Sequence, residues 1–218
     1  MRETGILLHI SSLATEYGIG DFGPAAYKFA EYLQSEGHKY WQILPINHCG
    51  YGNSPYNPIS AFAFSPYLIS PELLYQNGYI NHQVLNDAKL PSGDTIFYES
   101  VYKAKDKLLS IAATNWMLTN DVSAFIASQA STLKPYLAFL CLIRIYGDSA
   151  WYQWNEEHRQ YSDALFASLW EKHSEYMKMR AASQAMLGEQ ISAFREVLAK
   201  CSVSLVGDMP LYLSYESA

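Results

Sequence analysis

The chain has 218 residues, of which 50% are hydrophobic and 17% charged. This is enough for one domain with its own core, and it excludes a disordered chain. The 15 basic and 21 acidic residues give a net charge of −6 without a Lys/Arg block, so we expect no nucleic-acid partner. No apolar segment is long enough for a signal peptide or a membrane span. We therefore expect a cytoplasmic protein with no membrane partner.

A strand, a helix and a second strand are predicted in the first 44 residues. Residues 5–10 form a continuous apolar run, which predicts a buried strand. Asp21 is a candidate N-cap for a helix with Pro24 in its first turn, and Gly37 is placed to end that helix. Residues 40–44 predict another buried strand. Short connections in a strand–helix–strand unit imply that the two strands are parallel.

Helical patterns dominate from residue 71 to about residue 180. A long helix is predicted from about residue 163 to residue 200, and Gly188 is the position at which it is weakened or interrupted. A third buried strand begins near Val203 and leads into a loop. Because few residues follow this strand, we expect the chain to be a fragment. A helical insertion between strands two and three of a parallel α/β fold accounts for the whole pattern.

The three cysteines do not indicate a disulfide framework. They are far apart and lie outside any CxxC pair, so we also expect no metal site and interpret them as buried or half-buried thiols: Cys49, Cys141 and Cys201.

The segment that indicates a function is residues 41–60, WQILPINHCGYGNSPYNPIS. An apolar strand stops at Pro45, and a loop rich in Gly, Asn, Tyr and Pro follows. Such a loop at the C-terminal end of a strand is how α/β scaffolds present a binding surface. Tyrosines beside Asn and Ser, without clustered basic residues, favour a neutral polyhydroxylated ligand, because sugar rings stack on aromatic faces.

Several other candidates have a plain structural interpretation. His9 either faces a pocket or is a satisfied core histidine, and His48 is expected to support the loop. Asn53 serves a turn more readily than it binds a ligand. The pair Trp151 and Trp154 is expected to pack in the core rather than to form a sugar platform.

Four blocks of sequence resemble the amylomaltase-type 4-α-glucanotransferases, also called disproportionating enzymes, of glycoside hydrolase family 77. The blocks are RETGILLHISSL (2–13), YGIGDFG (17–23), WQILPINHCGYGNSPYNPISAFAFSPYLI (41–69) and VGDMPLYLSYESA (206–218). A weaker fifth block, SAWYQW (149–154), is similar to the family's Trp-x-x-Trp stretch. The Ser-Pro-Tyr loop and the Gly-Asp-x-Pro-x-Tyr strand are specific in combination.

The resemblance implies an α/β fold that is part of a (β/α)8 TIM barrel: its first three strands, with a helical insertion between strands two and three. The expected divisions are residues 1–70 (strands one and two), 71–180 (the inserted helices) and 181–218 (helix two and strand three). Family members transfer α-1,4-glucan segments between maltooligosaccharides by a retaining double displacement without a cofactor. Their catalytic carboxylates lie beyond the third strand, so we expect no catalytic residue here. Expected partners are maltooligosaccharides, starch- or glycogen-derived glucans, and the remainder of the barrel.

The resemblance also implies substrate-binding residues. Tyr56 matches the tyrosine that stacks on the sugar at the scissile bond, and Ser54 belongs to the same Ser-Pro-Tyr motif. Asp208 matches a supporting aspartate beside the catalytic centre. Tyr51 matches a tyrosine of a second glucan site. The structural alternatives are a packed turn tyrosine, a loop-capping aspartate and an exposed loop tyrosine, respectively.

Two other functions stay open. A non-catalytic glucan-binding or regulatory protein would keep the aromatic loop, and a hydrolase of the α-amylase type would share the barrel. The chain also departs from the family pattern, with Asn53 in place of the usual Asp and Glu216 in place of Asp in the Asp-Ser-Ala stretch. In each reading, an unclosed barrel leaves a sheet edge and an apolar face exposed.

Overall fold

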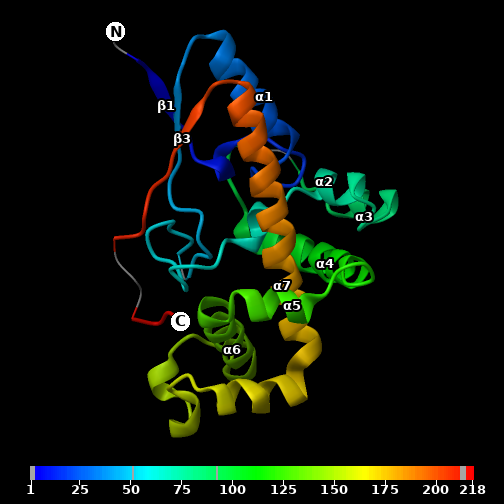
Figure 1. The fold of residues 1–218 in the computed structure, drawn as a ribbon, viewed down its shortest axis with the longest axis vertical. Helices are drawn as coiled ribbons and strands as arrows, with labels where there is room; N and C mark the ends of the chain where they lie inside the picture. The colour runs from blue at the N-terminus through cyan, green and yellow to red at the C-terminus, as the bar shows by residue number, and fades with distance from the viewer. Residues whose placement is uncertain (1–2, 51, 92, 212–214) are drawn as a thin grey trace.

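A computed structural model describes residues 3–50, 52–91, 93–211 and 215–218. Three short strands, β1 (Gly5–Leu7), β2 (Tyr40–Gln42) and β3 (Ser204–Val206), form a sheet in the order β1-β2-β3 (Figure 1). Both pairs of strands are parallel, and the register places Trp41 between Ile6 and Leu205. The prediction of parallel strands is confirmed.

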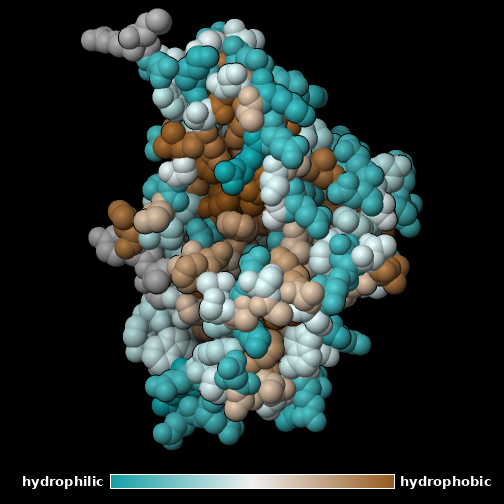
Figure 2. Space-filling model, viewed as in Figure 1, coloured by the Kyte–Doolittle hydropathy of each residue, from teal (hydrophilic) through white to brown (hydrophobic). Residues whose placement is uncertain are grey.

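The prediction that all three strands are buried is wrong. In β1 and β3 the central residue is half-buried and its neighbours are exposed, with Leu7 at 56% and Val206 at 40%. Alternate side chains of a strand point to opposite faces, and here only one face of the sheet is covered. Hydrophobic side chains gather on the surface at the level of the strands (Figure 2). The expected exposed apolar face is therefore present.

The covered face of the sheet packs on two helices, α1 (Pro24–Ser35) and α7 (Asp163–Lys200). Trp41 is fully buried there, with ring centroids 4.7 Å from Phe29 of α1 and 5.3 Å from Phe194 of α7. These large aromatic rings, in edge-on contact, join the sheet to both helices.

The predicted cap of α1 is wrong. Gly23 is the N-cap residue, and Asp21 is buried two residues earlier, where its carboxylate accepts the Gly23 N–H at 2.9 Å. Asp21 lies 3.8 Å from the ammonium of Lys105, which belongs to α4 (Tyr98–Trp116). This charge partner, on a helix far along the chain, accounts for the buried position of Asp21. The end of the helix is as predicted, because Gly37 has the left-handed φ of +76° that follows a helix C-cap.

Every element between β2 and β3 in the described part of the chain is helical, which confirms the helical interpretation of this region. These elements are η2 (Pro66–Leu68), α2 (Pro71–Gln76), α3 (His82–Asp87), α4, α5 (Val122–Ser128), α6 (Ala130–Tyr146), η3 (Trp151–Gln153), η4 (Glu156–His158) and α7. A further short 3-10 helix, η1 (Ile10–Ser12), lies between β1 and α1. Within the described ranges, no single helix is long and apolar enough to cross a membrane; α5 and α6, bent by 115°, pass that test only as a pair.

The long helix α7 runs from the other helices to the sheet (Figure 1). Gly188 does not interrupt it, contrary to prediction. The backbone departs from helical geometry at His173 instead, with φ −131° and ψ 21°. Leu187 and Gln190 on either side of the glycine are buried, so tertiary packing outweighs the weak helix propensity of one glycine.

Candidate functional site

The loop after β2 is folded back on itself. Two isolated antiparallel bridges, Asn47–Phe64 and Cys49–Pro58, join its outgoing and returning arms. Between them the backbone of His48 donates to the Ala63 carbonyl at 3.0 Å. The loop therefore behaves as a short irregular hairpin, which carries residues 52–57 at its tip.

The tip of this loop is a tight turn built on Ser54-Pro55-Tyr56. Asn57 N–H donates to the Ser54 carbonyl at 3.0 Å, and the Ser54 hydroxyl accepts the Tyr56 N–H at 3.3 Å. Asn53 precedes the turn with a left-handed φ of +56°, a conformation that asparagine tolerates better than most residues. Ser54 and Asn53 thus serve the turn. Whether Ser54 also contacts substrate stays a prediction.

Tyr56 and Asp208 meet at the C-terminal edge of the sheet. The phenol of Tyr56 donates to a carboxylate oxygen of Asp208 at 2.7 Å, and the other oxygen accepts the N–H of Met209 at 2.8 Å. This hydrogen bond, aided by the negative charge of Asp208, raises the pKa of Tyr56. Both side chains are exposed, Tyr56 to 39%.

Adjacent parallel strands explain this meeting. β2 and β3 pair in parallel, so the segments that follow them leave from the same edge of the sheet, and the chain after β3 runs beside the loop after β2 (Figure 1). The two principal residues predicted from sequence are brought together in this way. Tyr51, the third, lies outside the described residues.

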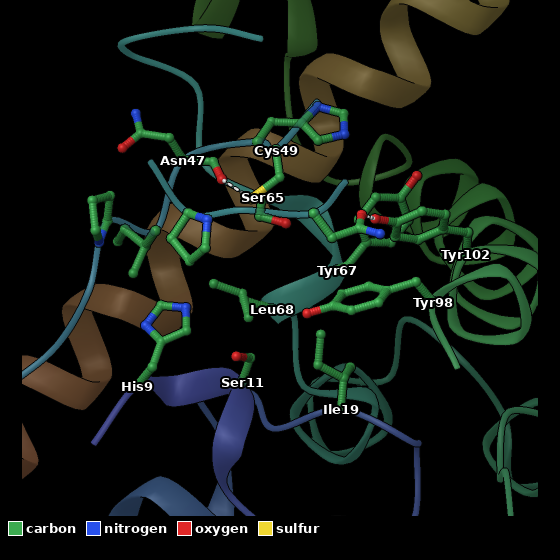
Figure 3. Close-up of a pocket in the computed structure, with 15 residues that line it drawn as sticks. His9, Ser11, Ile19, Asn47, Cys49, Ser65, Tyr67, Leu68, Tyr98 and Tyr102 are labelled. Carbon is green, nitrogen blue, oxygen red and sulfur yellow. Dashed lines mark hydrogen bonds between the residues drawn. The ribbon is translucent and has the colours of Figure 1, made fainter. Parts of the chain in front are cut away.

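A cavity of about 40 Å³ lies beneath the loop (Figure 3). His9 and Ser11 line one side of it, and Tyr98 and Tyr102 of α4 line the other. This volume suits a water molecule or two and is far below the roughly 300–1,000 Å³ of typical ligand pockets.

His9 faces this cavity, as one of its two sequence interpretations expected. Its Nδ1 is buried without a hydrogen-bond partner, and burial lowers the pKa of His9 to about 4. The imidazole is consequently neutral at pH 7. It offers a donor or an acceptor to the hollow but no charge.

Sequence reasoning did not identify the tyrosines of α4 that support the loop. Tyr98 and Tyr102 are four residues apart, so they share one face of the helix, and the hydroxyl of Tyr102 donates to the side-chain carbonyl of Asn53. The i, i+4 spacing was a usable signal that they act together. No signal in the sequence indicated that Tyr102 contacts Asn53 in the loop, because 49 positions separate the two residues.

Buried polar groups hold the base of the loop. The Nδ1 of His48 lies 2.8 Å from the hydroxyl of Tyr136 in α6, and burial lowers the pKa of His48 to about 3, so this histidine is neutral. Arg180 of α7 pairs with Asp106 of α4 at 2.9 Å close by. The expectation that His48 supports the loop is confirmed.

The Trp-x-x-Trp stretch has two roles. Trp154 is buried against Phe139 and Tyr146, which confirms the core interpretation. Trp151 is only half-buried, and its indole N–H donates to the carbonyl of Tyr215 at 2.6 Å. Ser149 and Tyr152 both donate to Glu216, at 3.1 and 3.2 Å. Tyr215 and Glu216 are thus bound to the helical region.

The cysteines are free thiols, with Cys141 and Cys201 buried and Cys49 half-buried, as interpreted. In the part of the chain that the structure describes, no group of three His, Cys, Asp or Glu side chains is arranged to hold a metal ion.

Comparison with known proteins connects this geometry to one family. The model of glycoside hydrolase family 77, described as 4-alpha-glucanotransferase, matches residues 8–218. The chain is 34% identical over 220 residues to the 4-alpha-glucanotransferase of Aquifex aeolicus, covering all of this chain and 44% of the relative. It is 30% identical to that of Thermus thermophilus, again covering 100% and 44%.

Solved structures agree with the sequence comparisons. The amylomaltase of Streptococcus agalactiae in complex with acarbose matches all of this chain and 45% of its own length, at 27% identity and a TM-score of 0.90. The amylomaltase of Corynebacterium glutamicum, at 17% identity and a TM-score of 0.69, shares the fold. The chain spans about 44% of the length of the bacterial relatives named above.

Proposed function

Because the chain belongs to glycoside hydrolase family 77, the 4-alpha-glucanotransferases, we propose that it is the N-terminal part of an enzyme that transfers α-1,4-glucan segments between maltooligosaccharides. Its substrates are maltooligosaccharides and glucans derived from starch or glycogen, and it works in the cytoplasm without a metal or an organic cofactor. The hydrogen bond between Tyr56 and Asp208 is the observation that carries the proposal. It joins the two most specific family motifs at one edge of the sheet.

The proposed architecture is the first three strands of a (β/α)8 barrel. Three parallel strands adjacent in chain order, with helices on one face only, support it. The exposed side chains of Leu7, Tyr40 and Val206 give the rest of the barrel an apolar surface to cover. We retain the division into residues 1–70, 71–180 and 181–218, although α7 passes through the second boundary without a break there.

In the proposed site, the ring of Tyr56 stacks on the sugar at the scissile bond. Asp208 holds the phenol and so sets the plane of that ring. Both oxygens of the carboxylate already accept hydrogen bonds, which suits a supporting group better than a nucleophile. The nucleophile and the general acid of the retaining double displacement come from outside this chain.

The outcome of the reaction depends on the acceptor. The enzyme must favour a sugar hydroxyl over water in the second displacement, which requires aromatic acceptor subsites and limited access of free water. The loop at residues 50–60 is the proposed lining, and Tyr51 is proposed to bind glucan at a second site. Ser54 is proposed to contact the sugar beside Tyr56.

The test is a transfer assay on the complete protein that contains this chain. With maltotriose as the only sugar, a glucanotransferase produces both longer and shorter oligosaccharides, which chromatography separates. Release of glucose and maltose without longer products would identify a hydrolase of the α-amylase type. Glucan binding without any conversion would favour the regulatory alternative.

A further inference from the structure

Two glutamines of α7 bind the backbone of the loop that follows the Ser-Pro-Tyr turn. The side chain of Gln184 accepts the N–H of Phe64 at 2.9 Å and donates to the carbonyl of the same residue at 2.8 Å. Gln190 makes the same two bonds with Ser70, at 2.7 and 3.1 Å. Both glutamines are buried, at 8% and 3% exposure. Each carboxamide therefore pairs with one backbone residue as a neighbouring strand would.

The two glutamine–backbone pairs are chemically equivalent, but their backbone partners belong to different parts of the fold. Phe64, the partner of Gln184, is bridged to Asn47 on the opposite arm of the loop. Asn47 in turn donates its side-chain amide to Ala61 at 2.8 Å. The hydrogen bonds of this bridge are made by the residues on either side of Phe64, from the His48 N–H to the Ala63 carbonyl at 3.0 Å and from the Ser65 N–H to the Ile46 carbonyl at 2.9 Å. Gln184 therefore holds the centre of the bridge that closes the hairpin carrying Tyr56.

Gln190 connects to a different part of the fold. Its partner Ser70 is the N-cap residue of α2, which leads the chain away from the sheet edge. The Ser70 pair therefore stabilises the start of a helix, without a hydrogen-bonded connection to the turn at residues 53–57 among the contacts described above.

The helix that carries Gln184 also delivers Asp208. α7 ends at Lys200, β3 spans Ser204–Val206, and Asp208 lies two residues beyond that strand. The part of α7 that follows His173 therefore supports both partners of the 2.7 Å hydrogen bond, the carboxylate through β3 and the phenol through Gln184 and the loop. A displacement of the loop along α7 would separate them.

We propose that Gln184 is a positioning residue, which sets Tyr56 against Asp208 by fixing the loop to α7, whereas Gln190 is its structural counterpart. The inference rests on the proposed function for its kinetic consequence. Its structural consequence, the order of the loop, is independent of any activity.

The equivalence of the two pairs supplies a matched control. In the complete protein, Gln184→Met and Gln190→Met each remove one two-point pairing and keep a side chain of similar size, so both leave one buried N–H and one carbonyl without a partner. We expect similar falls in melting temperature. Only Gln184→Met should raise KM for maltotriose, by about tenfold, as the loss of one or two net hydrogen bonds implies.

Hydrogen–deuterium exchange provides the second readout. Amides in residues 46–64 should exchange faster in Gln184→Met than in Gln190→Met. Equal effects of the two variants on KM and on this exchange, or no effect of Gln184→Met on either, would overturn the proposal. If the methionine variants do not fold, Gln184→Asn and Gln190→Asn replace them, since each keeps the carboxamide but is one methylene too short to make both hydrogen bonds. A wild-type protein without transfer activity would refute the proposed function, while the exchange comparison would still decide the role of Gln184.

Discussion

The hydroxyl of Tyr56 lies 2.7 Å from the carboxylate of Asp208, although 152 positions separate the two residues in the chain. Neither is buried, so burial does not force the contact. It arises because the parallel strands β2 and β3 release their following segments at one edge of the sheet. In the proposed enzyme this contact orients an aromatic ring toward the sugar.

Replacing Asp208 with Asn should lower the pKa of Tyr56. The carboxylate now raises that pKa by accepting the phenolic hydrogen and by its negative charge, and the amide removes the charge. A ¹³Cζ-tyrosine NMR titration of the variant, with Tyr56→Phe to assign the signal, measures the shift. An unchanged pKa would mean that the hydrogen bond is absent in solution.

The same substitution separates support from catalysis. Because Asp208 is proposed to orient Tyr56 rather than to attack the sugar, Asp208→Asn should reduce transfer by about tenfold, the scale of one charge-assisted hydrogen bond. Loss of a nucleophile would instead abolish detectable turnover. Steady-state kinetics with maltotriose distinguish the two results.

At position 56 the ring should matter more than the hydroxyl. Tyr56→Phe keeps the stacking face and loses the bond to Asp208, whereas Tyr56→Ala loses both. We expect KM for maltotriose to rise more in the alanine variant than in the phenylalanine variant. Equal kinetics in Tyr56→Ala and wild type would remove the stacking role. Tyr75→Ala, an exposed tyrosine of α2, is the control.

The buried pair of Lys105 and Asp21 should make stability depend on pH above neutrality. Burial lowers the pKa of Lys105 to about 8 from an ordinary value of 10.5, so between these pH values the unfolded chain binds more protons than the folded one. Stability from this group therefore rises as pH increases from 8 to 10.5, by on the order of 1–3 kcal/mol.

Urea denaturation at pH 8 and pH 10 tests this. Because tyrosines also titrate in this range, the quantity of interest is the difference between wild type and Lys105→Met. Lys107→Met is the control, since that lysine is on the same helix with 70% of its side chain exposed. A pH slope that is the same in all three proteins would contradict the assignment.

Trp41 should be the most sensitive position of the sheet. It is fully buried between Phe29 and Phe194, and Trp41→Ala leaves a cavity at the junction of β2, α1 and α7. Substitutions of this kind cost about 3–5 kcal/mol of unfolding free energy. Phe97→Ala, at a side chain that is 70% exposed, should cost far less in the same urea titration.

Local patterns were sufficient for the order of the elements, whereas Tyr56 and Asp208 were proposed as site residues because they match two family motifs. Short connections imply parallel strands, and parallel strands imply that the loops of Tyr56 and Asp208 share one edge, so the proximity of these two loops follows from chain order alone. The long helix ending at Lys200 and the left-handed Gly37 are likewise set by residues close in sequence.

The tertiary structure decided what depends on distant partners. Asp21 is a residue type that commonly caps helices, but here it is buried beside Lys105. The helix α7 continues through Gly188 because residues on both sides of the glycine are packed in the core. Strands that read as buried are half exposed, because burial requires a second layer that strand patterns do not specify. The role of Gln184 could not be predicted from the sequence for the same reason. Its backbone partner is 120 residues away, and no local sequence pattern specifies such a contact.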